Sequence, residues 1–88
     1  MPKAVITHNV PDVERWLKYK AERVSLLSPF ATGVTDHVAL DGSKSVAVAL
    51  DVKDLAALQS ALASPSPQLA AGMERHGVLP PLAVYVEK

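Results

Sequence analysis

Prolines and glycines divide this chain into short segments, and their positions constrain the fold more than any other feature of the sequence. Proline has no N–H for a strand ladder or a helix interior, and glycine accepts the left-handed backbone angles that end helices and form tight turns. Between these breaks, apolar residues recur either at alternate positions or at helical spacing. The expected elements are a strand at 3–10, a helix at 11–27, strands at 34–40 and 45–50, helices at 52–63 and 68–76, and a strand at 82–86.

This order predicts an α+β domain of ferredoxin-like type, in which strands and helices follow one another as β-α-β-β-α-β. Right-handed crossovers then place both helical regions on the same face of a four-stranded antiparallel sheet. A chain of 88 residues has room for one hydrophobic core, so residues 1–88 are expected to form a single domain. The other face of the sheet is left without a cover.

The first helical segment has an amphipathic pattern. Its apolar positions are Val13, Trp16, Leu17, Val24 and Leu27, and the opposite side carries Glu14, Arg15, Lys18, Glu22 and Arg23. We therefore expect Trp16 in the core and Arg23 in solvent. In the second helical region, Asp51 is expected to cap the helix at its start, and Gly77 to end it in a left-handed conformation.

Alternation in the last two strands separates bulky side chains from small ones. One side carries Val46, Val48, Leu50, Leu82, Val84 and Val86, and the other carries Ala47, Ala49, Ala83 and Tyr85. We expect the bulky set to meet the helices, and the alanines, Tyr85 and the strand histidines to face a partner or a cavity. Because an uncovered apolar face usually marks an interaction surface, the sequence predicts a homodimer that pairs through this face.

Composition argues against several classes of function. Nine basic and nine acidic residues cancel without forming a basic cluster, so nucleic acid and anionic membranes are not expected partners. The lack of cysteine removes disulfides, thiolate metal sites and a cysteine nucleophile. No metal-spaced His/Asp cluster or phosphate-binding glycine loop is present, so no metal site is expected. With no signal-peptide pattern and no apolar stretch of membrane-spanning length, we expect a cytoplasmic protein.

Two runs of residues carry a resemblance to a known group of proteins. The first strand ends in His8-Asn9-Val10-Pro11-Asp12, shortly before Trp16, and Met73-Glu74-Arg75-His76-Gly77-Val78 precedes a final strand that is led by prolines. With these runs, essentially the whole chain resembles the dimeric α/β-barrel superfamily. That group includes antibiotic-biosynthesis monooxygenases, stress-responsive α/β-barrel proteins and small cyclase-like proteins. The resemblance implies a homodimer with a pocket in each sheet–helix unit and, among the enzymes, oxidation of aromatic or polyketide substrates without a bound metal.

Strand histidines are the first candidates for chemistry. His8 ends the first strand and His37 lies in the second, and either acts as a general base if it lines the pocket and titrates near neutrality. The alternative is a packed or interface histidine that makes one hydrogen bond. Asn9 points to the opposite sheet face from His8, so the two are not expected to serve one pocket. Tyr85 can orient a ligand through its hydroxyl or anchor the dimer with its ring.

The superfamily's heme-degrading enzymes use an Asn on the first strand, a Trp and a helical His that ligates iron. Asn9, Trp16 and His76 invite that comparison. The match is poor because Trp16 is in phase with the apolar helix positions, and His76 stands at a helix C-terminus, where an imidazolium interacts well with the helix dipole. No cofactor is therefore expected.

Three functions remain open. The dimer binds a small hydrophobic ligand without chemistry, or it is a cofactor-independent monooxygenase or cyclase that acts on an aromatic or polyketide substrate, or it is a purely structural dimerisation unit. The second hypothesis assigns proton abstraction to His8 or His37. A void between side chains favours the first two functions, and a filled interior favours the third.

Overall fold

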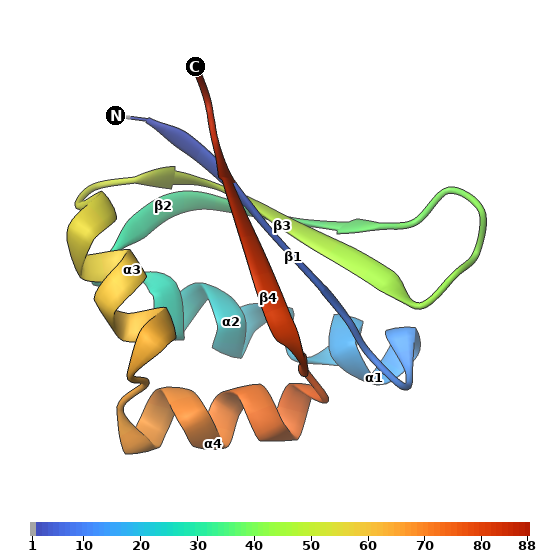
Figure 1. The fold of residues 1–88 in the computed structure, drawn as a ribbon. Coiled ribbons are helices and arrows are strands. Elements are labelled where there is room, and N and C mark those ends of the chain that lie inside the picture. Colours follow the sequence, from blue (N-terminus) through green and yellow to red (C-terminus); the bar gives the residue numbers. More distant parts are fainter. Residues whose placement is uncertain (1) are drawn as a thin grey trace.

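The computed structural model describes residues 2–88. In chain order its elements are β1 (Lys3–Asn9), α1 (Val13–Lys18), α2 (Lys20–Leu27), β2 (Ala31–Val38), β3 (Ser45–Val52), α3 (Leu55–Ala63), α4 (Pro67–His76) and β4 (Leu79–Val86). The strands form one antiparallel sheet in the order β2-β3-β1-β4. The helices lie on one face of this sheet, and the two chain ends lie near each other (Figure 1). The predicted α+β, ferredoxin-like fold is confirmed, with a sheet that is open at β2 and β4.

The predicted helix at 11–27 is in fact two helices. Asp12 caps α1 by accepting a hydrogen bond from the backbone N–H of Arg15, as its position before the apolar stripe suggests. Tyr19, at φ −97° and ψ 19°, then separates α1 from α2. In the structure Val24 is exposed and Arg23 is buried, the reverse of the expectation.

Other boundaries differ from the sequence prediction for local reasons. Asp51 does not cap a helix, because β3 continues to Val52 and its carboxylate pairs with Lys3 on β1 at 2.9 Å. The cap of α3 is Asp54, which accepts from a backbone N–H in the first turn. β2 begins before Gly33, whose φ of +62° lies at a register shift inside the strand.

The second helical region ends as predicted. Ser66 caps α4 by accepting from the N–H of Leu69, and proline follows in the first turn, where no N–H is needed. Gly77 ends α4 with φ +78° in the left-handed region, and the chain turns from there into β4. β4 contains both Pro80 and Pro81, which an edge strand tolerates because one of its sides has no ladder partner.

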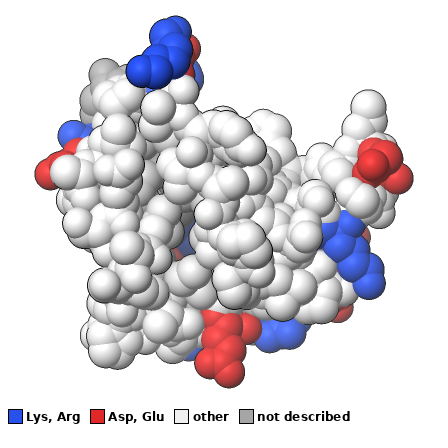
Figure 2. Space-filling model, in the orientation of Figure 1, with Lys and Arg blue, Asp and Glu red and all other residues white. Residues whose placement is uncertain are grey.

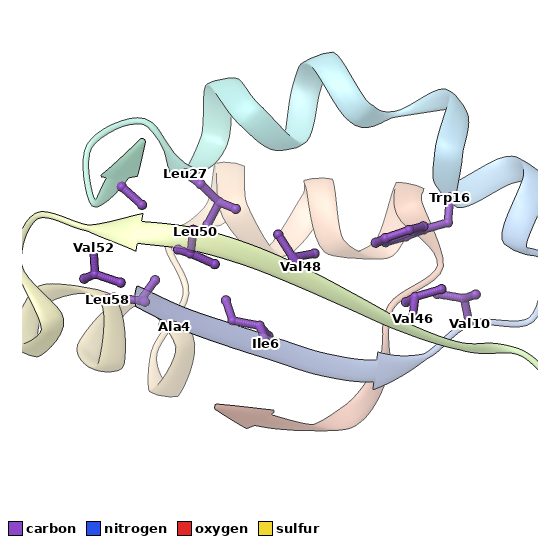
Figure 3. Packing of buried hydrophobic residues seen from close by; sticks show 11 residues of the cluster. Ala4, Ile6, Val10, Trp16, Leu27, Val46, Val48, Leu50, Val52 and Leu58 are labelled. Atoms are coloured by element: carbon purple, nitrogen blue, oxygen red, sulfur yellow. The ribbon is translucent and has the colours of Figure 1, made fainter. Parts of the chain in front are cut away.

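The core lies between the sheet and the helices (Figure 3). It contains the predicted bulky set of β3, with Val46, Val48 and Leu50 all buried, together with Trp16 and Leu58 from the helices. Full burial of an aliphatic side chain of this kind contributes about 1.5 to 3 kcal/mol. The prediction that the bulky face of β3 meets the helices is confirmed.

The outer face of the sheet, which the helices do not cover, carries small and polar side chains. Ala47 and Ala49 of β3 are flanked on this face by Thr7 of β1 and by Thr35 and His37 of β2. On β4, Tyr85 is 61% exposed. Among residues 2–88, no helix is long and apolar enough to cross a membrane.

Candidate functional site

A pocket lies between the sheet and the helix layer, beside β4. Figure 2 shows a largely uncharged face with a hollow next to this strand and charged atoms at its bottom. The volume open to the centres of water-sized molecules is about 60 Å³, room for several waters or a small ligand at roughly 10 to 15 Å³ per water. The apolar lining comes from every layer: Ile6, Leu26, Leu27, Val48, Leu62, Leu69, Met73, Val78 and Leu82. The polar lining is His8, Arg23 and His76.

Arg23 of α2 is the charged group of the pocket, and it forms a bidentate ion pair with Asp36 of β2. The Arg23 Nε donates to Oδ1 at 3.0 Å and Nη2 donates to Oδ2 at 2.5 Å. The two side chains are only 7% and 4% exposed. Asp36 reaches this position because it pairs with Val48 and therefore points to the helix face. A buried charge of this kind persists only when it is paired and hydrogen-bonded.

Trp16 supports the guanidinium from one side. The Arg23 Cζ lies 4.0 Å from the Trp16 ring centroid, and Nη2 also donates to the Trp16 carbonyl at 3.0 Å. Cationic groups are attracted to the face of an indole ring. The indole N–H of Trp16 is itself buried without a hydrogen-bond partner among the described residues. Packing, and not its own N–H, therefore holds this ring.

His76, at the end of α4, connects Arg23 to Glu22. The Arg23 Nη1 lies 3.3 Å from the His76 Nδ1, and the His76 Nε2 lies 3.0 Å from a carboxylate oxygen of Glu22. Because a guanidinium can only donate and a carboxylate can only accept, Nδ1 carries the lone pair and Nε2 carries the proton. Tyr19 stacks on the ring at 4.8 Å between centroids. Burial lowers the pKa of His76, although the Glu22 hydrogen bond acts in the opposite direction.

The network ends at the protein surface. Arg75 donates from Nε and Nη2 to the same Glu22 oxygen, at 3.1 and 2.8 Å. These hydrogen bonds, with that of His76, lower the pKa of Glu22 and keep it ionised. A continuous chain thus runs from Asp36 through Arg23 and His76 to Glu22.

His8 is the second histidine of the pocket. Its Nδ1 lies 3.2 Å from the carbonyl oxygen of Asn9, which can only accept, so Nδ1 carries the proton of the neutral ring and Nε2 keeps its lone pair. Its ring meets Trp16 edge-on at 6.0 Å. Burial lowers the pKa of His8, and the nearby positive charge of Arg23 lowers it further. At neutral pH His8 is therefore an uncharged ring with one free basic nitrogen.

The structure separates the two strand histidines. His8 pairs with Val46 and lies on the helix face, so the expectation that it joins the alanines and Tyr85 on the other face is wrong. His37 does lie on the outer face, exposed, with Nδ1 3.1 Å from the carbonyl of Thr35. The cause is alternation along the strands: His8 lies two residues after Ile6, which faces the helices, whereas His37 pairs with Ala47 on the outer face. Only His8 can act in the pocket between sheet and helices.

Asn9 is exposed and accepts a hydrogen bond from the Ser45 hydroxyl at 2.8 Å. A shallow hollow at the β1–β4 edge is nevertheless lined by both His8 and Asn9, so the expectation that they share no pocket is wrong at this edge. The hollow forms where the β1–β4 register jumps between Thr7 and Asn9. The main pocket has no contribution from Asn9 or Tyr85.

The chain does not fit a heme site of the superfamily type. Both ring nitrogens of His76 already have partners, Glu22 and Arg23, so neither is free to bind iron. Asn9 and Trp16 do not line the pocket with His76. The three residues that suggested this comparison therefore do not converge on one ligand.

Sequence reasoning missed Arg23, Asp36 and Glu22. One signal was present, since Arg23 follows Trp16 at a separation of seven residues, which brings the two onto one helix face. A second was Asp36, a carboxylate at an alternating position inside a strand. Neither signal shows that Arg23 pairs with Asp36, because the two residues lie on different elements of the fold.

Solved structures share this fold at low sequence identity. The crystal structure of an antibiotic biosynthesis monooxygenase matches with TM-score 0.68 at 13% identity, over 100% of this chain and 97% of that chain. A candidate antibiotic biosynthesis monooxygenase from Deinococcus radiodurans gives 0.59 at 13%, over 100% and 91%. Another from Nitrosomonas europaea gives 0.58 at 9%, over 100% and 97%. The resemblance is thus confirmed at the level of fold; no family model and no curated protein matches the sequence.

Proposed function

We propose that this protein binds a small, largely apolar molecule with one acidic hydroxyl, such as a phenol or an enol, between its sheet and helices. The observation that carries the proposal is the polar equipment of an otherwise apolar pocket. The bonds of Arg23 to Asp36, Trp16 and His76 use every N–H of its guanidinium except one on Nη1. His8 adds a basic Nε2 in the same lining.

These two groups suit a hydroxyl in a complementary way. The spare N–H of Arg23 donates to the hydroxyl oxygen, while the His8 Nε2 accepts its proton. Charge-assisted hydrogen bonds of this kind are stronger than neutral ones, and a low-dielectric pocket strengthens them further. An aliphatic molecule without a hydroxyl leaves both groups unpaired, so the pocket discriminates against it.

A second candidate function is a cofactor-independent monooxygenase, favoured by the fold neighbours and by the pairing of a base with a cation. His8 removes the hydroxyl proton, and the Arg23 charge stabilises the phenolate or enolate that forms. With dioxygen as the second substrate, a phenol becomes a quinone: one oxygen atom enters the ring and the other leaves as water. The lowered pKa of His8 keeps this base unprotonated at neutral pH.

Binding of phenol, followed by NMR through the methyl group of Met73, tests the proposal. Met73 lines the pocket, so we expect its signal to shift in a saturable way as phenol is added. His8→Ala is expected to weaken binding about tenfold, since one hydrogen bond to a charged or basic group is lost. The matched control is His37→Ala on the outer face, with wild-type binding.

The proposed site is contradicted if the Met73 signal does not shift when phenol is added, or if the two histidine variants weaken phenol binding equally. To separate binding from oxygenation, oxygen uptake is measured with 1-naphthol in wild-type protein and in His8→Ala. Binding without uptake leaves the ligand-binding function and removes the monooxygenase candidate.

We further propose that two copies of the chain pair through the outer sheet face. Tyr85 is exposed on β4, and the centre of the outer face is formed by the small side chains Ala47 and Ala49, which allow a second sheet to approach closely. The only ion pair found on this face, Lys3 with Asp51, lies toward one end of the paired strands within the described residues. A second copy therefore meets few charges that it must desolvate.

A further inference from the structure

The spare N–H of Arg23 depends on the state of His76. The Arg23 Nη1 has two N–H groups; one donates to the His76 Nδ1 at 3.3 Å, and the other has no partner among the described residues. The guanidinium is planar, and its bonds to Asp36 and Trp16 hold it against His76. A change at His76 therefore acts directly on Nη1 and on its spare N–H.

Glu22 decides which nitrogen of His76 has that lone pair. Its carboxylate accepts the Nε2 proton at 3.0 Å, which leaves Nδ1 unprotonated in the neutral ring. Arg75 holds the carboxylate from the surface side, and Tyr19 stacks on the imidazole and restrains its rotation. The ring is 3% exposed. Glu22 therefore sets the tautomer of the imidazole, and Tyr19 restrains its orientation.

We propose that His76 is a positioning residue that aims Arg23 at the ligand only while its imidazole is neutral, with Glu22 selecting the tautomer. This inference rests on the proposed ligand pocket and adds to it a residue that acts through another. Protonation of His76 places a hydrogen on Nδ1 and thereby turns a donor–acceptor contact with Arg23 into a contact between two donors of like charge. Repulsion between the two cations then displaces Nη1 and the spare N–H that it carries.

The charged groups around His76 determine the pH at which its imidazole becomes protonated. From α2 it faces Glu22 and Arg23, from its own helix Arg75, and from β1 His8; the Tyr19 ring covers one side. Asp36 of β2 reaches it only through Arg23. Burial and the positive charges outweigh Glu22, so the pKa of His76 is lowered and the ring is neutral at pH 7. Charging it requires a more acidic solution than an ordinary histidine needs.

The first test is made on the wild-type chain without ligand. Long-range ¹H–¹⁵N NMR of histidine rings distinguishes a lone-pair nitrogen from an N–H nitrogen. We expect His76 to have its proton on Nε2 and its lone pair on Nδ1, and the Arg23 Nε–H signal to move with the titration of His76. The inference is overturned if Nδ1 carries a proton at pH 7, or if the Arg23 signal does not shift as His76 is titrated.

The second test uses variants and phenol as the probe, which stays neutral over the range studied. Wild-type binding is expected to weaken about tenfold between about pH 7.5 and about pH 5, the loss of one charge-assisted hydrogen bond. His76→Gln retains an amide acceptor for Arg23 and a donor for Glu22 but cannot titrate. Relative to its own binding at pH 7.5, it is expected to lose most of the acid weakening; the remainder comes from His8.

Glu22→Gln sharpens this test. It removes the charge that raises the pKa of His76, so the acid weakening is expected to move to lower pH. The matched control is Glu74→Gln, an exposed glutamate on α4 that is expected to leave the profile unchanged. A profile that moves equally in both variants, or not at all in Glu22→Gln, overturns the role of Glu22.

The outcomes for the two proposals are separable. If phenol fails to bind wild-type protein, the proposed function is wrong, and the role of His76 is then decided by the tautomer and the Arg23 signal alone. If phenol binds with the same pH profile in wild type and His76→Gln, the pocket stands and the positioning role is wrong.

Discussion

The inner and outer faces of the sheet come from the same strands and differ in almost every physical property. On the inner face, alternate residues of β3 are bulky and buried, and the charged side chains Arg23 and Asp36 lie among them in a hydrogen-bond network. On the outer face, small residues alternate with hydroxyl groups, and the pair Lys3–Asp51 is open to solvent. We therefore expect substitutions of charged or apolar side chains to change the free energy of unfolding much more on the inner face than on the outer face.

The two strand histidines show how burial changes the properties of the same residue type. His8 on the inner face loses hydration, so its pKa is lowered and its free nitrogen faces a pocket. His37 on the outer face keeps contact with water. Residue type made both of them candidates, and burial distinguishes them.

The largest expected effect is on the ion pairs of the two faces. Asp36→Ala leaves the Arg23 charge buried without its partner, so the free energy of unfolding is expected to fall by about 3 to 5 kcal/mol. Asp51→Ala opens the solvent-exposed pair with Lys3 and is expected to cause a far smaller loss. Urea denaturation at pH 7 measures both. Equal losses would mean that burial does not govern the worth of these pairs.

Neighbouring residues of β3 give the next comparison. Leu50→Ala deletes a buried side chain between sheet and helices and is expected to cost about 2 to 5 kcal/mol of unfolding free energy. Ala49→Ser, one position away on the outer face, is expected to change it by less than about 0.5 kcal/mol. Thermal and urea unfolding of the two variants check this. A costly Ala49→Ser would show that the outer face is already packed in the free chain.

The pH dependence of stability tests the burial of His8. The folded-state pKa of His8 is lowered, so the unfolded chain binds more protons as the pH falls below about 6.5, and the free energy of unfolding falls with it. His76 acts in the same direction. Between about pH 7 and about pH 5, His8→Gln is therefore expected to lose less stability than wild type does. Urea titrations of both proteins at the two pH values give the comparison.

The smallest expected effect on the folded chain is at Tyr85. Tyr85→Ser removes an exposed ring and is expected to change the unfolding free energy of the monomer by about 0.5 kcal/mol or less. Because the ring belongs to the proposed contact between two copies, the same change is expected to shift the protein from dimer to monomer. Sedimentation velocity over a range of concentrations measures the shift. A wild-type protein that stays monomeric throughout contradicts pairing through the outer face.

The sequence by itself determined the order of the elements and the division of β3 into two faces. Prolines, glycines and alternation are local signals, and local signals suffice to predict the strands and the left-handed end at Gly77. They failed where a distant contact decided the outcome. Asp51 joined a strand because β1 supplied a ladder and a cation, and the end of β3 moved with it.

Only the tertiary structure decided the site. Arg23 was expected to face solvent, and its burial is tolerable only because β2 brings Asp36 to it. His76 looked like a simple helix end, yet its two nitrogens meet side chains that precede it by more than fifty residues. A pocket of this kind is made of contacts between elements, and such contacts leave no periodic trace in the sequence.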